Sequence, residues 1–156
     1  VTSIVLTSMK TKKILPFLFC MFLTIHVQAQ TTKETTMELL THATWEHGKP
    51  IYGDYRRKVF NDSVMTDWYK DQYGHLVRTE YPMKYYLTDK EEKAFDKTKI
   101  GKIKNGKYIM AINPHGGFVC YRILELSKGQ LKIVSIRLQG TMSTPNIPWD
   151  YTPLKE

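Results

Sequence analysis

The sequence predicts an all-β protein whose strands form an antiparallel up-and-down barrel of about eight strands, preceded by a short N-terminal helix. Downstream of residue 43 the chain passes through about eight or nine short segments rich in aromatic and β-branched residues, which favour strands. Most neighbouring segments are separated by only two to five turn residues. Such connections join antiparallel strands and are too short for the helix of a parallel crossover.

A β-sandwich is the alternative fold for this pattern. A barrel is favoured because a long meander exposes the edges of its outer strands, and closure of the sheet removes those edges. A sandwich needs a longer crossover between its two sheets, and the one candidate for such a crossover is the segment Leu87–Lys99.

The elements are expected in the following order along the chain. Thr35 or Thr36 can cap a short helix that ends near His42, and a first strand follows around Trp45. The later strands are expected at Tyr55–Phe60, Val64–Lys70, His75–Tyr81, Met83–Leu87, Lys99–Lys104, Lys107–Ile112, Phe118–Leu126 and Leu131–Leu138.

Two local patterns predict how some of these strands are connected. Thr88 and Glu91 have the spacing of a capping box and predict one or two helical turns. Asn105 and Gly106 predict a two-residue hairpin turn, because both residue types tolerate the positive φ angles of such a turn. This hairpin would join the two predicted strands on either side of it.

The C-terminal segment is rich in proline, with Pro145, Pro148 and Pro153. Proline cannot donate a hydrogen bond to a neighbouring strand. The segment at about residues 140–156 is therefore expected to be an extended arm and not a central strand.

The N-terminal residues 9–30 are typical of a secretory signal. Three lysines lie just before the apolar run Ile14–Ile25, and Val27 and Ala29 are the small residues that a signal peptidase recognises. The sequence therefore predicts an exported protein, periplasmic or extracellular, after cleavage near Ala29.

This interpretation sets the expected domain organisation. Residues 1–8 are interpreted as upstream translation, so residues 1–29 are expected to be absent from the mature protein. Residues 30–156 then form a single barrel domain, which we expect to be monomeric. No segment of this domain approaches the ~18 consecutive apolar residues of a membrane-spanning helix, so no transmembrane segment is expected in the mature chain.

The distribution of charge restricts the classes of partner that we expect. The chain carries a formal net charge of +8, but its basic residues are spread along the sequence, which is typical of a solvated surface. Nucleic acid is not an expected partner in the periplasm or outside the cell.

Cys20 lies in the signal, so Cys120 is the single cysteine of the mature chain and is expected to be a buried small hydrophobic residue.

The titratable residues show no pattern of a catalytic or metal site. His42, His47, His75 and His115 lack the spacing of converging zinc ligands. Cys120 and His115 belong to one turn and strand, with no residue nearby to orient the imidazole for nucleophilic catalysis. We therefore expect a protein that is not an enzyme and that needs neither metal nor cofactor.

Several residues of this chain match the pattern of a known family. A short helix runs into Trp45, Arg137 lies on the last of the predicted strands, and the segments Tyr85–Asp89, Phe95–Asp96 and Gly101–Ile109 lie between them. In these features the chain resembles the lipocalins and the secreted lipocalin-like proteins of Gram-negative bacteria, which are small barrels of the calycin group. The resemblance implies that Trp45 packs at the closed end of the barrel, with Arg137 across it in a cation–π contact.

The resemblance also implies that the barrel binds a small hydrophobic or amphipathic ligand. The candidate ligand-binding residues are Trp68, Tyr85, Tyr108 and Arg122; the aromatic side chains among them offer a large contact area with a polar tip. Strand propensity alone also accounts for a high density of aromatic residues. The alternative function is therefore that of a non-enzymatic envelope protein with a filled barrel, which binds a partner through its outer surface or its C-terminal arm.

Overall fold

The computed structural model describes residues 33–47, 55–79, 81–139, 146 and 148–155 of the chain. The predicted signal at residues 9–30 lies outside these residues. The compact unit Glu34–Glu156 holds every element described below. The elements are the helix α2 (Thr36–Thr41), the 3₁₀ helix η1 (Lys97–Lys99) and the strands β1 (Thr44–His47), β2 (Arg56–Phe60), β3 (Val64–Lys70), β4 (Leu76–Arg78), β5 (Met83–Thr88), β6 (Tyr108–Ile112), β7 (Phe118–Ser127), β8 (Gln130–Gln139) and β9 (Pro148–Pro153).

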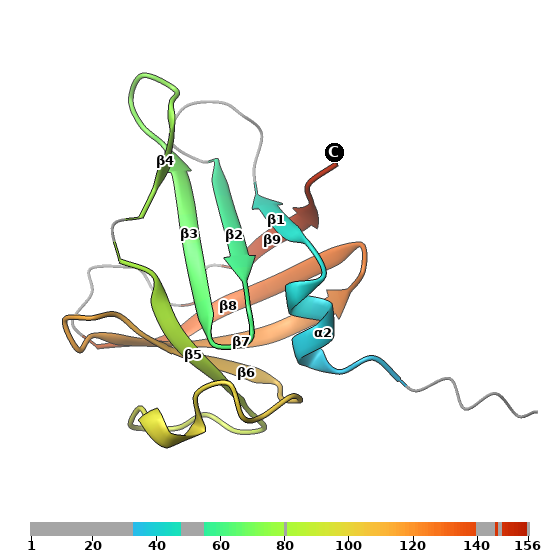
Figure 1. The fold of residues 1–156 in the computed structure, drawn as a ribbon, viewed down its shortest axis with the longest axis vertical. Helices are drawn as coiled ribbons and strands as arrows, with labels where there is room; N and C mark the ends of the chain where they lie inside the picture. The colour runs from blue at the N-terminus through green and yellow to red at the C-terminus, as the bar shows by residue number, and fades with distance from the viewer. Residues whose placement is uncertain (1–32, 48–54, 80, 140–145, 147, 156) are drawn as a thin grey trace, which may run out of the picture. The chain divides into compact units, whose positions relative to one another are not determined.

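Eight of these strands close into an antiparallel barrel (Figure 1). Neighbouring strands pair in the order β1, β2, β3, β5, β6, β7, β8 and β9, and β9 returns to pair with β1. The strand β4 is an addition to the barrel, paired with the end of β3 that contains Trp68 and Lys70. The predicted all-β barrel is confirmed, and the closed sheet rules out the sandwich.

The C-terminal segment is not the predicted arm, because β9 lies between β1 and β8 in the sheet. Trp45 of β1 lies opposite Pro153, and Leu131 of β8 lies opposite Tyr151. Pro148 and Pro153 are the first and last residues of β9. A missing N–H group is tolerated at a strand end more readily than in its middle, so the two prolines do not exclude a central strand. Residues 140–145 and 147 of the predicted arm lie outside the described residues.

Helix α2 covers one end of the barrel, and its start agrees with the predicted cap. The Thr35 hydroxyl accepts a hydrogen bond from the Glu38 N–H, and the Glu38 carboxylate accepts one from the Thr35 N–H at 2.7 Å. Met37 and Leu40 turn inward and are at most 2% exposed. Trp45 follows the helix, is fully buried, and donates its indole N–H to the Leu40 carbonyl at 2.8 Å.

Side chains on the strands alternate between the barrel interior and the outer face. On β5, Tyr85 belongs to the interior cluster and Tyr86 to a smaller cluster on the outer face. The interior cluster consists of Met37, Leu40, Trp45, Phe60, Met65, Tyr85, Leu87, Ile109, Ala111, Val119, Leu131, Ile133 and Tyr151. The outer cluster consists of Tyr86, Met110, Phe118 and Cys120, so Cys120 is buried as the sequence predicts.

Asn105 and Gly106 do not form the predicted hairpin. Neither residue has a positive φ angle, and Lys99–Lys104 is not a strand. The strand β6 instead pairs with β5, with Tyr108 opposite Thr88. The sequence signal was wrong here because the same two residues serve a different local structure.

That local structure is a close approach of the backbone to β5 and to helix α2. A Cβ atom on Gly106 would lie 2.6 Å from the Thr88 backbone nitrogen, so only glycine fits at this position. The Asn105 side-chain oxygen accepts a hydrogen bond from the Thr36 N–H at 3.0 Å. The Gly106 N–H donates to the Thr36 hydroxyl at 3.3 Å.

Residues 89–107, named the strap here, connect β5 to β6 (Figure 1). Phe95 of the strap packs against the outer cluster, whereas Ile103 packs against the interior cluster. The predicted helical turns at Thr88–Glu91 are wrong, since the described chain has no helix there. The Thr88 hydroxyl instead lies 3.2 Å from the carboxylate of Glu92. The short helix η1 begins later in the strap, after Asp96, whose carboxylate accepts a hydrogen bond from the Thr98 N–H at 2.9 Å.

Candidate functional site

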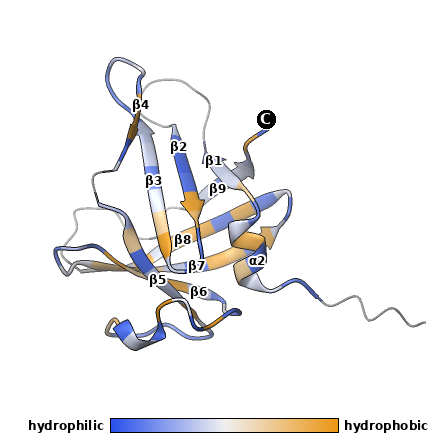
Figure 2. Ribbon diagram, in the orientation of Figure 1, coloured by the Kyte–Doolittle hydropathy of each residue, from blue (hydrophilic) through white to orange (hydrophobic). Residues whose placement is uncertain are grey.

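The interior faces of β2 and β3 form a ladder whose chemistry changes along the barrel. Arg56 lies opposite Tyr69, Lys58 lies opposite Asp67, and Phe60 lies opposite Met65. Figure 2 shows this change as hydrophilic colouring over much of β2 that gives way to hydrophobic colouring at the helix-covered end. The interior is therefore apolar near helix α2 and carries charge toward the other end.

Lys58 is the most unusual residue of this ladder, because it is charged and only 3% exposed. Its ammonium group forms an ion pair with Asp67 and lies 5.3 Å from the ring centroid of Tyr121. Burial alone lowers the pKa of Lys58, but the neighbouring Asp67 carboxylate outweighs burial, so the pKa lies above its ordinary value. The side chain is therefore a cation at neutral pH, held inside an apolar barrel.

Two buried tyrosines complete what we name the interior polar cluster, made of Lys58, Asp67, Tyr121 and Tyr151. Burial raises the pKa of Tyr121 and raises that of Tyr151 to about 12. Both phenols are therefore neutral at physiological pH. The cluster presents one cation, one carboxylate and two neutral hydroxyl-bearing rings to the barrel interior.

Aromatic side chains of β1 and β9 continue the lining beside Tyr151. The His47 ring lies 4.9 Å from the ring of Trp149 and 5.5 Å from the ring of Tyr151, measured between centroids. The His47 Nδ1–H donates to the Asp150 carbonyl at 2.6 Å, which fixes the orientation of the imidazole. These rings offer contact area to the planar or aliphatic part of a small molecule.

Ser135 of β8 has a buried hydroxyl oxygen without a hydrogen-bond partner among the described residues. The residue is 5% exposed and lies opposite Tyr121, on the interior face of the sheet. A buried polar group without a partner costs stability, and proteins rarely leave one unexplained.

The four ligand-binding residues predicted from the sequence do not share one site. Tyr85 is interior but lies at the helix-covered end, where its hydroxyl donates to the Asn61 carbonyl at 2.6 Å. Tyr108 packs against the outer cluster, and Arg122, opposite it on β7, is exposed. Trp68 alternates with the interior residues of β3 and so lies on the outer face.

The predicted contact between Trp45 and Arg137 involves a side chain that lies outside the described residues. The backbone register shows where the two residues sit. Trp45 lies opposite Pro153, and Tyr151 of the same strand lies opposite Leu131. Trp45 of β1 therefore lies level with the end of β8 that contains Leu131, whereas Arg137 lies farther along β8. The ring that contacts the Trp45 indole edge-on is His42, with a centroid separation of 5.3 Å.

Sequence reasoning missed the interior polar cluster, although a signal for its ion pair is present. The turn at Asn61–Ser63 sets the register of β2 against β3, and counting outward from it places Lys58 opposite Asp67. Opposite charges at facing positions of one sheet face are a stabilising cross-strand pair. Tyr121 and Tyr151 have no comparable signal, because they approach Lys58 only through closure of the barrel.

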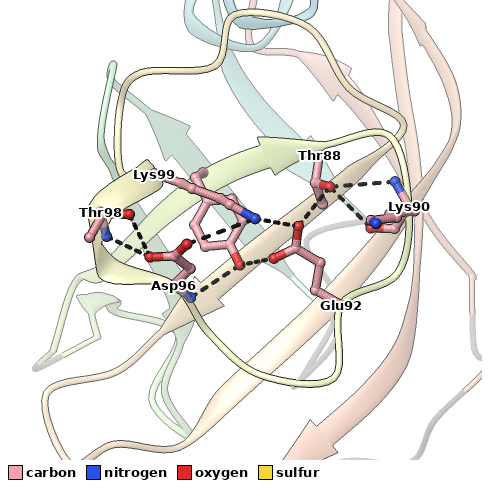
Figure 3. A network of polar contacts seen from close by, with 7 residues as sticks. Thr88, Lys90, Glu92, Asp96, Thr98 and Lys99 are labelled. Carbon is pink, nitrogen blue, oxygen red and sulfur yellow. Dashed lines mark hydrogen bonds and ion pairs between the residues drawn. The ribbon is translucent and has the colours of Figure 1, made fainter.

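A second network of polar contacts holds the strap to the outer face (Figure 3). The hydroxyl of the fully buried Tyr86 donates to the Glu92 carboxylate at 2.7 Å and accepts from the Asp96 N–H at 3.2 Å. The Lys99 ammonium donates to the same Glu92 carboxylate at 2.7 Å. Figure 3 also shows Thr88, the last residue of β5, and Lys90 of the strap within this network.

The groups of this second network shift one another's pKa values. Burial raises the pKa of Tyr86, and the hydrogen bond to Glu92 raises it further. Burial also raises the pKa of Glu92, but the contacts with Lys99 and Tyr86 outweigh it and leave the pKa below its ordinary value. The network consists of satisfied pairs, so its role is to fix the strap in position.

Two further observations concern the described residues as a whole. No three His, Cys, Asp or Glu side chains among them are grouped as the ligands of a metal ion would be. No helix in the described part of the chain has the length and hydropathy needed to cross a membrane.

No protein-family model, curated protein or solved structure matches this chain. The assignment of fold therefore depends on the strand order and register alone. These give a closed eight-stranded antiparallel barrel, an architecture consistent with that of the calycins.

Proposed function

We propose that the protein binds a small amphipathic molecule inside its barrel, as a lipocalin-like binding protein would. The apolar part of the molecule would face the helix-covered end, and its polar part would face the interior polar cluster. The observation that carries this proposal is the change from apolar to charged residues along one interior ladder, with Lys58 buried at its polar part. Pockets for small molecules combine such an apolar wall with a few placed polar groups.

The Ser135 hydroxyl, for which the described residues offer no hydrogen-bond partner, supports the same proposal. A ligand head group that accepts or donates a hydrogen bond would satisfy this oxygen, which no described residue does. The rings of His47, Trp149 and Tyr151 would provide the contact area beside it.

A filled barrel that acts through its outer surface is the second candidate function. It is favoured by the helix-covered end, where Trp45, Phe60 and Tyr85 are each at most 3% exposed and occupy the interior. The two candidates differ in whether a small molecule can reach the barrel interior.

Isoleucine methyl spectra test the proposal directly. Ile109 and Ile133 are fully buried in the interior cluster, whereas Ile112 and Ile136 pack on the outer face. Titration of the ¹³C-methyl-labelled protein with 1-decanol and with decanoate should shift the interior methyl signals. Interior signals that stay unchanged at saturating concentrations of both probes would leave the filled barrel as the function.

The interior polar cluster should contribute to this binding. The double variant Lys58→Met/Asp67→Leu removes its ion pair without leaving an unpaired charge, and we expect it to weaken binding of the probe that shifts the interior signals. The control is Lys132→Met/Asp150→Leu, which removes a facing pair between β8 and β9 that is 36% and 53% exposed. Equal weakening in both double variants would contradict a role for the interior cluster.

We also propose that the protein is exported and acts in the periplasm or outside the cell. The support is the signal-like sequence of residues 9–30. N-terminal sequencing of protein from the cell envelope should give Gln30 as the first residue. A folded product that retains residues 9–29 would contradict this proposal.

A further inference from the structure

The outer face of the barrel carries a cavity of about 450 Å³ beside the strap. Its walls come from three parts of the chain: the start of β5, the end of β6 with the turn that follows, and the strap. The lining residues are Pro82, Lys84, Lys97, Ile100, Ile112, Asn113, Pro114 and Gly116. Lys84 and Ile112 lie opposite each other in register on the outer face, so this cavity is separate from the barrel interior.

The lining combines an apolar floor with two cations. Ile100, Ile112 and the two prolines supply aliphatic surface, and none of the described residues that line the cavity is acidic. Lys84 and Lys97 are exposed and form no ion pair with any described residue. By contrast, Lys99, Lys104, Lys128 and Lys132 each pair with a carboxylate. In the described part of the chain, the cavity therefore brings two positive charges without an ion-pair partner next to apolar surface.

The walls of this cavity are held in place by hydrogen bonds on both sides. On the strap side, the network of Tyr86, Glu92 and Lys99 fixes the segment that leads to Lys97 (Figure 3). On the other side, the Asn113 side chain accepts hydrogen bonds from the His115 N–H at 2.9 Å and the Gly117 N–H at 3.1 Å. A preformed wall loses little conformational freedom when a ligand binds.

We propose that this outer cavity binds a single-chain amphipath with an anionic head group, such as a free alkyl carboxylate. The alkyl chain would lie against Ile100 and Ile112, and the head group would be held by Lys84 and Lys97. The volume lies within the range typical of sites for small molecules, which favours a free molecule over a flat membrane surface. This site is independent of the function proposed for the barrel interior.

The test uses the ¹³C-methyl-labelled full domain with decanoate as the probe. Because Ile100 and Ile112 line the outer cavity, we expect their methyl signals to shift and to saturate together along one binding curve. Ile109 and Ile133 report the barrel interior in the same spectrum. Saturable shifts at Ile100 and Ile112 support the outer site whatever the interior signals do, and their absence overturns it.

Two charge tests separate the proposed recognition from general hydrophobic binding. The double variant Lys84→Gln/Lys97→Gln should raise the Kd of decanoate at the outer cavity by about fivefold or more, a size that follows from partly exposed ion pairs. Lys107→Gln is the matched control, since Lys107 is an exposed lysine of the strap that does not line the cavity. The Kd of decanoate for the Lys107→Gln variant should equal the Kd for the unmodified protein.

The second charge test reverses the charge of the probe and leaves the protein unchanged. Decyltrimethylammonium has a similar chain and the opposite charge, and it should not shift Ile100 or Ile112. Equal affinity for the two probes would overturn the proposal, and so would an unchanged Kd in the lysine double variant.

Discussion

Lys58 and Asp67 face each other across β2 and β3, and their side chains form an ion pair in which the lysine is only 3% exposed. Such a pair is expensive to break by removing one partner, because the other charge then remains buried without compensation. It is much less costly to replace both partners by apolar residues. The two kinds of change therefore separate the electrostatic role of the pair from its packing.

Asp67→Asn should lower the free energy of unfolding by about 3 kcal/mol, whereas Lys58→Met/Asp67→Leu should lower it much less. The value lies at the low end for buried pairs because the Asp67 side chain keeps 33% of its surface exposed. Urea denaturation at pH 7 measures both. Asp150→Asn is the control in an exposed pair and should cost less than about 1 kcal/mol. A similar loss in Asp67→Asn and Asp150→Asn would contradict this account.

Gly106→Ala should lower Tm, because the new Cβ atom would lie 2.6 Å from a backbone atom of Thr88. We expect a loss of about 1–3 kcal/mol in the free energy of unfolding, which is typical of overpacking. Gly129→Ala is the matched control, since a Cβ atom there meets nothing within 4 Å. Thermal denaturation of the two variants side by side gives the comparison, and an equal Tm would refute the close approach.

Trp45→Ala should lower the free energy of unfolding by about 3–5 kcal/mol, because the indole is fully buried beside helix α2. Trp45→Phe keeps most of the apolar contact but loses the hydrogen bond to the Leu40 carbonyl, so it should cost less. Trp68→Ala, on the outer face of β3, serves as the control and should cost less than Trp45→Ala. The measurement is urea denaturation followed by circular dichroism.

The strap should loosen in acid because Glu92 has a pKa below its ordinary value of 4.5 in the folded protein. A lowered pKa means that the carboxylate stabilises the folded state fully above about pH 4.5. This contribution is lost as the pH falls toward the folded-state pKa. Glu92→Gln should therefore be less stable than the unmodified protein at pH 7, and the difference should shrink below pH 4.5. A difference that stays constant from pH 7 to pH 3 would contradict the assignment.

Local sequence patterns predicted much of the barrel correctly. The cap at Thr35, the strands at Val64–Lys70 and Phe118–Leu126, and the burial of Cys120 follow from propensity, alternation and turn chemistry. These are properties of neighbouring residues, so a single sequence contains them.

Two of the errors share a different physical cause, since they depend on residues far away in the chain. The role of Gly106 is set by Thr88 and helix α2, and the strand β9 exists because β1 and β8 both offer it a partner. The interior polar cluster likewise brings together residues from β2, β3, β7 and β9. Such relationships appear only when the barrel is closed.

The position of β9 also affects the order in which the barrel folds. Of all the barrel strands it is the last to leave the ribosome, yet it supplies one of the two neighbours of β1, the first strand. The pairing of β9 with β1 therefore joins the two barrel strands that lie farthest apart in the sequence. Because a pairing of such long sequence separation forms slowly, we expect closure of the barrel to follow the formation of local hairpins such as that of β2 with β3.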